Sequence, residues 1–313
     1  MLCVRPDALP AGRWSRSSYA DRELRRLITE SPWLRLSIGQ EPAAARIYIL
    51  APRRECREGE PVPQRPQVAA PSWAVVRADG GLAMEVLPLA QTRTLRDNLD
   101  KLARRDLVRS LQNPGSRFVG QVDFNILVKD ASDAWVRAAS SSQESLHLKD
   151  GTPIALELCN RTGSTLYISV LSLDANGAIN SVYPPVGGEG ALRPGPALSI
   201  GNHPGQSLIV RFPKDLSFAL DAEGNAPQAV TDYLKLIVST QPLDVRSLLQ
   251  SAVSHGQHRG QRAQGVPPTA TILGRLLADI LAGQSTVRSL DVEMPAAEDW
   301  STEIRTLRVK RSA

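Results

Sequence analysis

The residues of this chain with the most obvious chemical potential are its three cysteines and four histidines. Together these side chains can form a nucleophilic pair or a zinc site, but each arrangement needs characteristic spacings. No such spacing is present, because the cysteines stand far apart and no histidine lies near one of them; the set is Cys3, Cys56, Cys159, His147, His203, His255 and His258. We therefore predict no catalytic residue, no metal site and no cofactor, and the odd, sparse cysteine set does not indicate a disulfide framework.

Cys56 is the one cysteine whose surroundings suggest a reactive thiol. Arginines on both sides of it would lower the pKa of the thiol and favour the nucleophilic thiolate. Glu55 and Glu58 offset this field, so we interpret Cys56 as an unreactive loop residue and keep a Cys56-dependent enzyme of unrecognised type as an alternative. Cys159 sits in an apolar alternation and is interpreted as a small sheet residue.

Charge and composition restrict the classes of partner. The net charge is +5, but the arginines are scattered along the chain and aromatic residues make up only 4%, so a base-stacking surface and nucleic-acid binding are not favoured. The hydrophobic fraction of 42% is sufficient for a buried core. Neither a run of about 18 apolar residues nor an apolar leader is present, so we expect a cytoplasmic protein without a membrane partner.

The segment from Gly151 to Leu249 carries the strongest structural signal. Apolar and polar residues alternate at a period of two, and glycine, proline, asparagine and aspartate interrupt the alternation at short intervals. This pattern is typical of an antiparallel β-sandwich. The predicted fold class is therefore α+β and mainly β, with a small N-terminal αβ module and a C-terminal helix followed by a closing strand.

Changes of composition divide the chain into four segments. Residues 1–112 are predicted to form the αβ module, with helices over 19–30 and 94–111 and with the first ten residues frayed. Residues 116–249 are predicted to form the β-sandwich domain. The polar, glycine-rich stretch 254–268 is typical of a flexible linker, and residues 269–313 are predicted to form an amphipathic helix, with its apolar stripe at 272–281, and the closing strand.

Two strand predictions within the sandwich are specific enough to test. Pro153–Asn160 and Thr165–Leu173 are expected to pair as a hairpin through the turn at residues 160–163, and the second strand is expected to be central because both of its faces are apolar. Tyr233–Thr240 is expected to be a core strand with one face buried. In this register Lys235 and Ser239 point outward, to the solvent side.

The candidate binding site is the loop that begins at the end of the sequence NSVY. Tyr183, Pro184, Pro185 and Val186 form it, and loops on rigid β-scaffolds commonly carry binding residues. A rigid aromatic side chain followed by two prolines also needs little ordering on binding. A plain strand exit with an extended proline turn is the alternative interpretation.

Several longer runs resemble a known family. LYISVLSLDANGAINSVYPP, LRPGPALSIG, YLKLIVSTQPLDVRSLL and EDWSTEIRTLRVKR are similar to a C-terminal β-rich region of bacterial and fungal caspase-like (metacaspase-type) proteins. WAVVRADGGL and LRDNLDKLARRDLVRSLQNP also resemble that region, so the likeness covers roughly residues 45–312. It implies an accessory domain that accompanies a caspase-fold peptidase.

The peptidase chemistry of that family does not carry over to this sequence. A caspase-like domain needs a His-Gly pair after one strand and a cysteine in an Asp-x-Cys context after another, so that the imidazole polarises the thiol. His255-Gly256 lies in the predicted linker, and neither Cys56 nor Cys159 has that context. We therefore expect no peptidase activity from this chain by itself. The resemblance implies a protein partner such as a caspase-like peptidase domain, and a glycan-binding sandwich is a further alternative.

Overall fold

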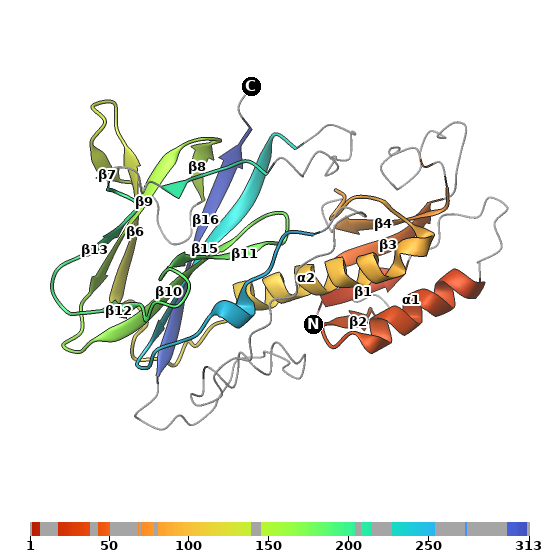
Figure 1. Ribbon diagram of the computed structural model, residues 1–313, viewed down its shortest axis with the longest axis horizontal. Helices are drawn as coiled ribbons and strands as arrows, with labels where there is room; N and C mark the ends of the chain where they lie inside the picture. Colours follow the sequence, from red (N-terminus) through yellow and green to blue (C-terminus); the bar gives the residue numbers. More distant parts are fainter. Residues whose placement is uncertain are drawn as a thin grey trace. The chain divides into compact units, whose positions relative to one another are not determined.

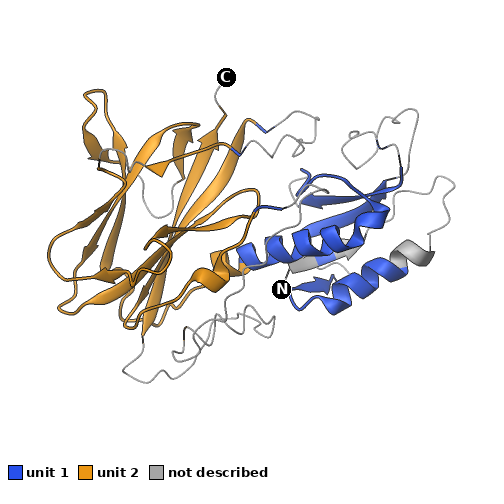
Figure 2. Ribbon diagram, in the orientation of Figure 1, with its two compact units in different colours: residues 1–106, 213–227, 252–261 blue, residues 107–212, 228–251, 262–313 orange. Residues whose placement is uncertain are grey.

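The structure is a computed structural model of the whole chain. It describes residues 2–6, 18–37, 43–50, 68, 70–77, 81–138, 145–203, 208–213, 227–253, 273 and 299–311. The chain divides into two compact units, shown in Figure 2. Unit 1 comprises residues 1–106, 213–227 and 252–261, and unit 2 comprises residues 107–212, 228–251 and 262–313.

Unit 1 contains a mixed five-stranded sheet in the order β2-β1-β3-β4-β5. β1 (Leu2–Pro6) lies between β2 (Leu34–Leu36) and β3 (Ala45–Leu50) and runs parallel to both. β4 (Ser72–Arg77) and β5 (Leu87–Pro88) continue the sheet in antiparallel fashion. The prediction that the first ten residues are frayed is therefore wrong, because Leu2–Pro6 is an inner strand. Its five residues are too few to show a period on their own, and the two neighbouring strands supply its pairing.

Two helices bury their apolar stripes on one face of this sheet. α1 (Ser18–Glu30) contributes Leu24, Leu27 and Ile28, and α2 (Thr92–Ser110) contributes Leu95 and Leu99 to the same core cluster. The short helix η1 (Leu89–Gln91) leads into α2. A second, smaller cluster that includes alternate residues of β3 and β4 consists of Tyr48, Ala74, Val76 and Leu82. Both helices were predicted, and their periodic leucines are buried as expected.

Unit 2 is mainly β and contains two sheets (Figure 1). The larger sheet has the order β11-β10-β15-β16-β8, with β12 also paired to β10. Its strands are β8 (Leu146–Lys149), β10 (Leu166–Leu173), β11 (Ile179–Tyr183), β12 (Ala191–Leu192), β15 (Ala229–Ser239) and β16 (Trp300–Lys310). The pairing is antiparallel except between β16 and β8, which run parallel.

The smaller sheet has the order β13-β9-β6-β7, with β14 also paired to β9. Its strands are β6 (Val122–Lys129), β7 (Trp135–Arg137), β9 (Pro153–Asn160), β13 (Leu198–Ile200) and β14 (Leu208–Ile209), and all of its pairs are antiparallel. The alternate residues predicted to face the core are buried on both sheets: Ile154, Leu156, Leu158, Leu166, Ile168 and Val170 are each at most 4% exposed.

The predicted hairpin between 153–160 and 165–173 is wrong. β9 belongs to the smaller sheet and β10 to the larger one, so residues 160–163 cross from one sheet to the other. Buried Asn160 shapes this crossing: its side-chain oxygen accepts hydrogen bonds from the amide and hydroxyl of Thr162, and its side-chain amide donates to the carbonyls of Ser164 and Leu192. A turn-like sequence between two apolar strands does not distinguish a hairpin from such a crossing.

The strand predicted at 233–240 forms part of β15, and only half of its orientation was predicted correctly. Leu234, Leu236 and Val238 are buried as expected. Lys235 and Ser239 are not on a solvent face, because they are 1% and 6% exposed. The last residues of α2 cover this second face at Lys235. The alternation of residues within β15 gives no information about this contact, so the burial of Lys235 could not be predicted from it.

Other expectations concern residues outside the described part of the chain. The predicted linker 254–268, the helix at 272–281 apart from Leu273, and the loop around Cys56 all belong there. A strand is present where the closing strand was expected, and it is β16. Among the described residues, no helix is long and apolar enough to cross a bilayer.

Candidate functional site

The predicted binding loop lies between β11 and β12, at one edge of the larger sheet (Figure 1). A tight turn precedes β11, and in this turn the amide of Gly177 donates to the Asp174 carbonyl at 3.0 Å. Gly177 has a φ of 87°, which glycine adopts without strain. The turn formed by the sequence DANG therefore joins β10 and β11 as a hairpin.

The base of this loop is held by hydrogen bonds. The Ser181 hydroxyl donates to the Pro184 carbonyl at 2.8 Å, and the amide of Gly188 donates to the Pro185 carbonyl at 2.8 Å. Gly190 accepts a backbone hydrogen bond from Ile168 of β10 at 2.9 Å. A Cβ on Gly190 would lie 2.2 Å from the Ile168 carbonyl oxygen, so only glycine allows this close approach.

The four predicted binding residues divide into a buried base and an exposed tip. Pro184 is buried, and Tyr183 is half-buried opposite Val170 of β10. Pro185 and Val186 are exposed, and Val186 is 68% exposed, more than any other large hydrophobic residue in the described part of the chain. The structure therefore places the accessible apolar area at Val186 rather than at the tyrosine.

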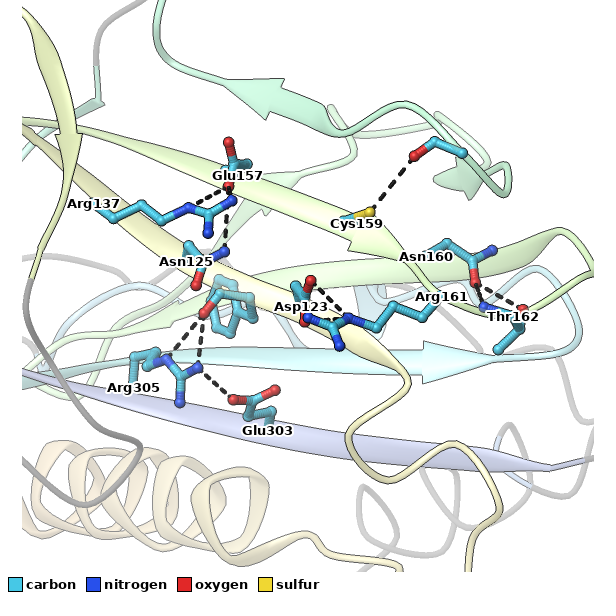
Figure 3. A network of polar contacts seen from close by, with 12 residues as sticks. Asp123, Asn125, Arg137, Glu157, Cys159, Asn160, Arg161, Thr162, Glu303 and Arg305 are labelled. Carbon is cyan, nitrogen blue, oxygen red and sulfur yellow. Dashed lines mark hydrogen bonds and ion pairs between the residues drawn. The ribbon is translucent and has the colours of Figure 1, made fainter.

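A second group of polar residues lies on β6, β9 and neighbouring segments (Figure 3). Glu157 of β9 accepts hydrogen bonds from the guanidinium of Arg137, at 2.5 and 2.9 Å, and from the side-chain amide of Asn125 at 3.3 Å. Asp123 forms an ion pair with the guanidinium of Arg161. Both arginine side chains are more than 60% exposed, so solvent screens each pair and its contribution to stability is small.

Arg305 of β16 connects the two sheets of unit 2. Its guanidinium donates to the Phe124 carbonyl of β6 at 2.8 and 3.1 Å and forms an ion pair with Glu303 at 2.6 Å. Burial raises the pKa of Glu303, and the positive charge of Arg305 opposes this effect. The Glu303 carboxylate is thus paired with Arg305 on its own strand, and the guanidinium of Arg305 makes the contact with β6.

Cys159 has a backbone partner rather than a catalytic one. Its thiol is partly buried on β9 and donates to the Gly195 carbonyl, with 3.6 Å between sulfur and oxygen. Within the described residues, no group of three histidine, cysteine or acidic side chains is arranged to hold a metal ion. The structure gives Cys159 the structural environment expected of a sheet residue.

The most unusual ionisable group in unit 2 is Lys235, which sequence reasoning misplaced. Its Nζ donates to the carbonyls of Arg109 and Leu111, which close the end of α2. These carbonyls have no partner within the helix, so a cation there is favourable. Burial, helped by the nearby charge of Arg109, lowers the pKa of Lys235 to about 8. The position of this lysine between Leu234 and Leu236, in the apolar part of β15, was the one sequence feature that could have indicated its burial.

Unit 1 has its own buried polar cluster around Asp100 of α2. The Ser31 hydroxyl, at the end of α1, donates to Asp100 at 2.5 Å, and Arg96 lies 3.8 Å from the same carboxylate. Burial raises the pKa of Asp100, while the Ser31 hydrogen bond and the charge of Arg96 lower it. The guanidinium of Arg104 stacks over Trp33 at 4.7 Å. These contacts tie α2 to the segment after α1 without forming a nucleophile and base pair.

Comparison with known proteins gives no match to this chain among protein-family models, curated proteins or solved structures.

Proposed function

We propose that this chain is a non-catalytic interaction region that recognises a partner protein and serves a caspase-like peptidase system. In this proposal unit 2 is an antiparallel β-sandwich that presents the loop of residues 182–188 as its contact surface. The single observation that supports this function best is the 68% exposure of Val186 at the tip of a loop whose base is hydrogen-bonded.

The loop has the physical properties of a preorganised contact. Its buried Pro184 and the close approach of Gly190 to β10 fix the backbone before any partner arrives. Binding therefore requires little loss of conformational entropy. Exposed apolar area on such a rigid loop favours a protein surface with a matching apolar depression.

The chemistry available to the chain agrees with a binding role. The thiol of Cys159 contacts a backbone carbonyl, and the carboxylate of Glu303 is paired with Arg305. Both groups therefore have structural partners within unit 2. The link to a caspase-like system rests on the sequence resemblance over residues 45–312.

The test is capture of a caspase-like peptidase domain from the same genome by the full chain. Val186→Ser should weaken capture at unchanged thermal stability, because Val186 lies at the exposed tip. Val119→Ser is the matched control, since Val119 is 55% exposed on another segment. Equal capture by the wild type and both variants would remove the loop from the proposed contact, and a fall in melting temperature with Val186→Ser would make Val186 a structural residue.

A further inference from the structure

Four exposed basic side chains lie together on one face of the larger sheet of unit 2, and we refer to them as the basic edge. They are His147 and Lys149 of β8 and Arg308 and Lys310 of β16. The parallel register places Arg308 beside His147 and Lys310 beside Lys149. Residues in register on neighbouring strands share a face about 4.8 Å apart, so two pairs of basic side chains stand side by side.

This arrangement opposes folding rather than supporting it. Like charges directly opposite each other on a sheet are destabilising. Among the described residues no carboxylate forms an ion pair with any member of the basic edge. Asp150, which follows Lys149 directly, instead accepts a hydrogen bond from the amide of Phe212 at 3.0 Å. The basic edge is therefore a surface that attracts negative charge.

β8 is also the last strand of its sheet among the described strands. At its outer edge the Lys149 carbonyl accepts a hydrogen bond from the amide of Thr152 at 3.1 Å, so the amides are the groups to consider there. The Asp150 amide donates to the Lys310 carbonyl at 2.9 Å. The backbone N–H and C=O groups of the even-numbered residues of this strand therefore point toward β16. Backbone groups of successive residues point to opposite edges, so the amides of His147 and Lys149 point away from β16. Within the described part of the chain, neither amide has a backbone partner at that outer edge.

Protection against aggregation explains the presence of only two of the four residues of the basic edge. Proteins often place lysine on an edge strand to prevent unwanted strand pairing, and this would account for His147 and Lys149. It does not account for Arg308 and Lys310, because β16 is already paired on both sides, with β15 and β8. Two cations on an inner strand, beside Lys149 and His147 on the edge strand, indicate a surface that recognises a ligand.

We propose that the basic edge binds an extended acidic segment of a partner protein, which adds to β8 as a further strand. Main-chain hydrogen bonds to an open sheet edge supply affinity, and alternate side chains supply specificity. In this complex, carboxylates at every second position of the added segment face the basic edge. The site lies at the opposite edge of the sheet from the β11 loop, so it goes beyond the function proposed above and does not depend on it.

An acidic peptide fits this surface better than a nucleic acid does. Binding of single strands relies on exposed aromatic rings that stack on bases. The aromatic residue on this face of β15 is Tyr233, which stands in register with Thr306 of β16, and the guanidinium of Arg109 lies over its ring at 5.5 Å. The outward amides of His147 and Lys149, by contrast, offer hydrogen bonds of the kind that a peptide strand uses.

The experiment measures binding of a short, capped, fluorescein-labelled peptide of alternating glutamate and threonine to the full chain. Lys149→Gln combined with Lys310→Gln should weaken binding about fivefold, as expected for the loss of two exposed charge contacts. Lys129→Gln, which removes an exposed lysine from β6, should leave binding within about twofold because its charge contributes only at long range. Hydrogen exchange should show new protection of the His147 and Lys149 amides when the peptide is bound.

Several outcomes would overturn the proposal. They are no binding of the acidic peptide, binding that the double variant leaves unchanged, or binding without protection at His147 and Lys149. An equal affinity for an alternating lysine and threonine peptide would exclude charge recognition. Tighter binding of single-stranded oligothymidine or of anionic lipid vesicles, lost in the same double variant, would assign the basic edge to a nucleic acid or a membrane instead. The Val186→Ser protein should bind the acidic peptide normally, so this site and the loop can fail separately.

Discussion

Removal of the buried lysine should change how the stability of the protein depends on pH. Lys235 is 1% exposed, and its pKa falls from 10.5 in water to about 8 in the folded protein, mainly because burial disfavours the charged form. The unfolded chain therefore binds more protons than the folded chain between about pH 8 and 10.5. In that window the free energy of unfolding rises with pH, and below about pH 8 the full cost of the buried charge is present.

The difference between 10.5 and about 8 corresponds to about 3 kcal/mol over the whole window, at about 1.4 kcal/mol per pH unit. Between pH 7 and 9.5 the expected gain is about 2 kcal/mol. Lys235→Met keeps the length of the side chain and removes the charge, so this gain should be missing from the variant. At pH 7 the variant also loses the donor to the Arg109 and Leu111 carbonyls, which offsets the relief of removing the charge.

The assay is urea unfolding of the wild type, Lys235→Met and Lys310→Met at several pH values from 7 to 9.5. Lys310 is an exposed lysine on the neighbouring strand β16, so its variant controls for the loss of one positive charge. The stability advantage of the wild type over Lys235→Met should grow by about 2 kcal/mol across this range. If the advantage stays constant, or grows equally over Lys310→Met, then Lys235 is not a desolvated cation at the end of α2.

Two further changes test the packing of the sheets and the base of the loop. Leu236→Ala removes a side chain that is 1% exposed and should cost about 2–5 kcal/mol in urea unfolding, whereas Ile209→Ala at a 48% exposed position should cost less than about 1 kcal/mol; similar losses would show that β15 is not a core strand. Gly190→Ala should cost about 2 kcal/mol or more, because the residue has a φ of 68° and a new Cβ would meet the Ile168 carbonyl oxygen. Gly163→Ala is its control, since a Cβ there meets open space, and equal melting temperatures for the two variants would contradict this close approach.

The elements that sequence periodicity could predict are those whose burial is visible within one segment. The leucines of α2 and the alternation in β9 and β10 predicted both type and buried face, because each pattern repeats several times within the element. The turn before β11 was predictable because Gly177 adopts a conformation that few other residues tolerate.

Properties that depend on distant partners could not be predicted in the same way. The strand at Leu2–Pro6 exists because β2 and β3 flank it, and the face of Lys235 is buried because the end of α2 covers it. The connection at residues 160–163 has the composition of a hairpin turn but joins two different sheets. At the candidate site, the sequence could not predict the division of the loop between its buried base and the exposed tip at Val186.

The most direct test of the proposed function is the equilibrium affinity of the full chain for a purified caspase-like peptidase domain from the same genome. Burying a valine side chain in an interface is worth about 1.5–3 kcal/mol, so Val186→Ser should raise Kd about tenfold or more, while Val119→Ser should leave it within about twofold. Unchanged melting temperatures for both variants would confirm that the effect acts on binding. The absence of any binding, or an equal Kd for all three proteins, would contradict recognition of such a partner through this loop.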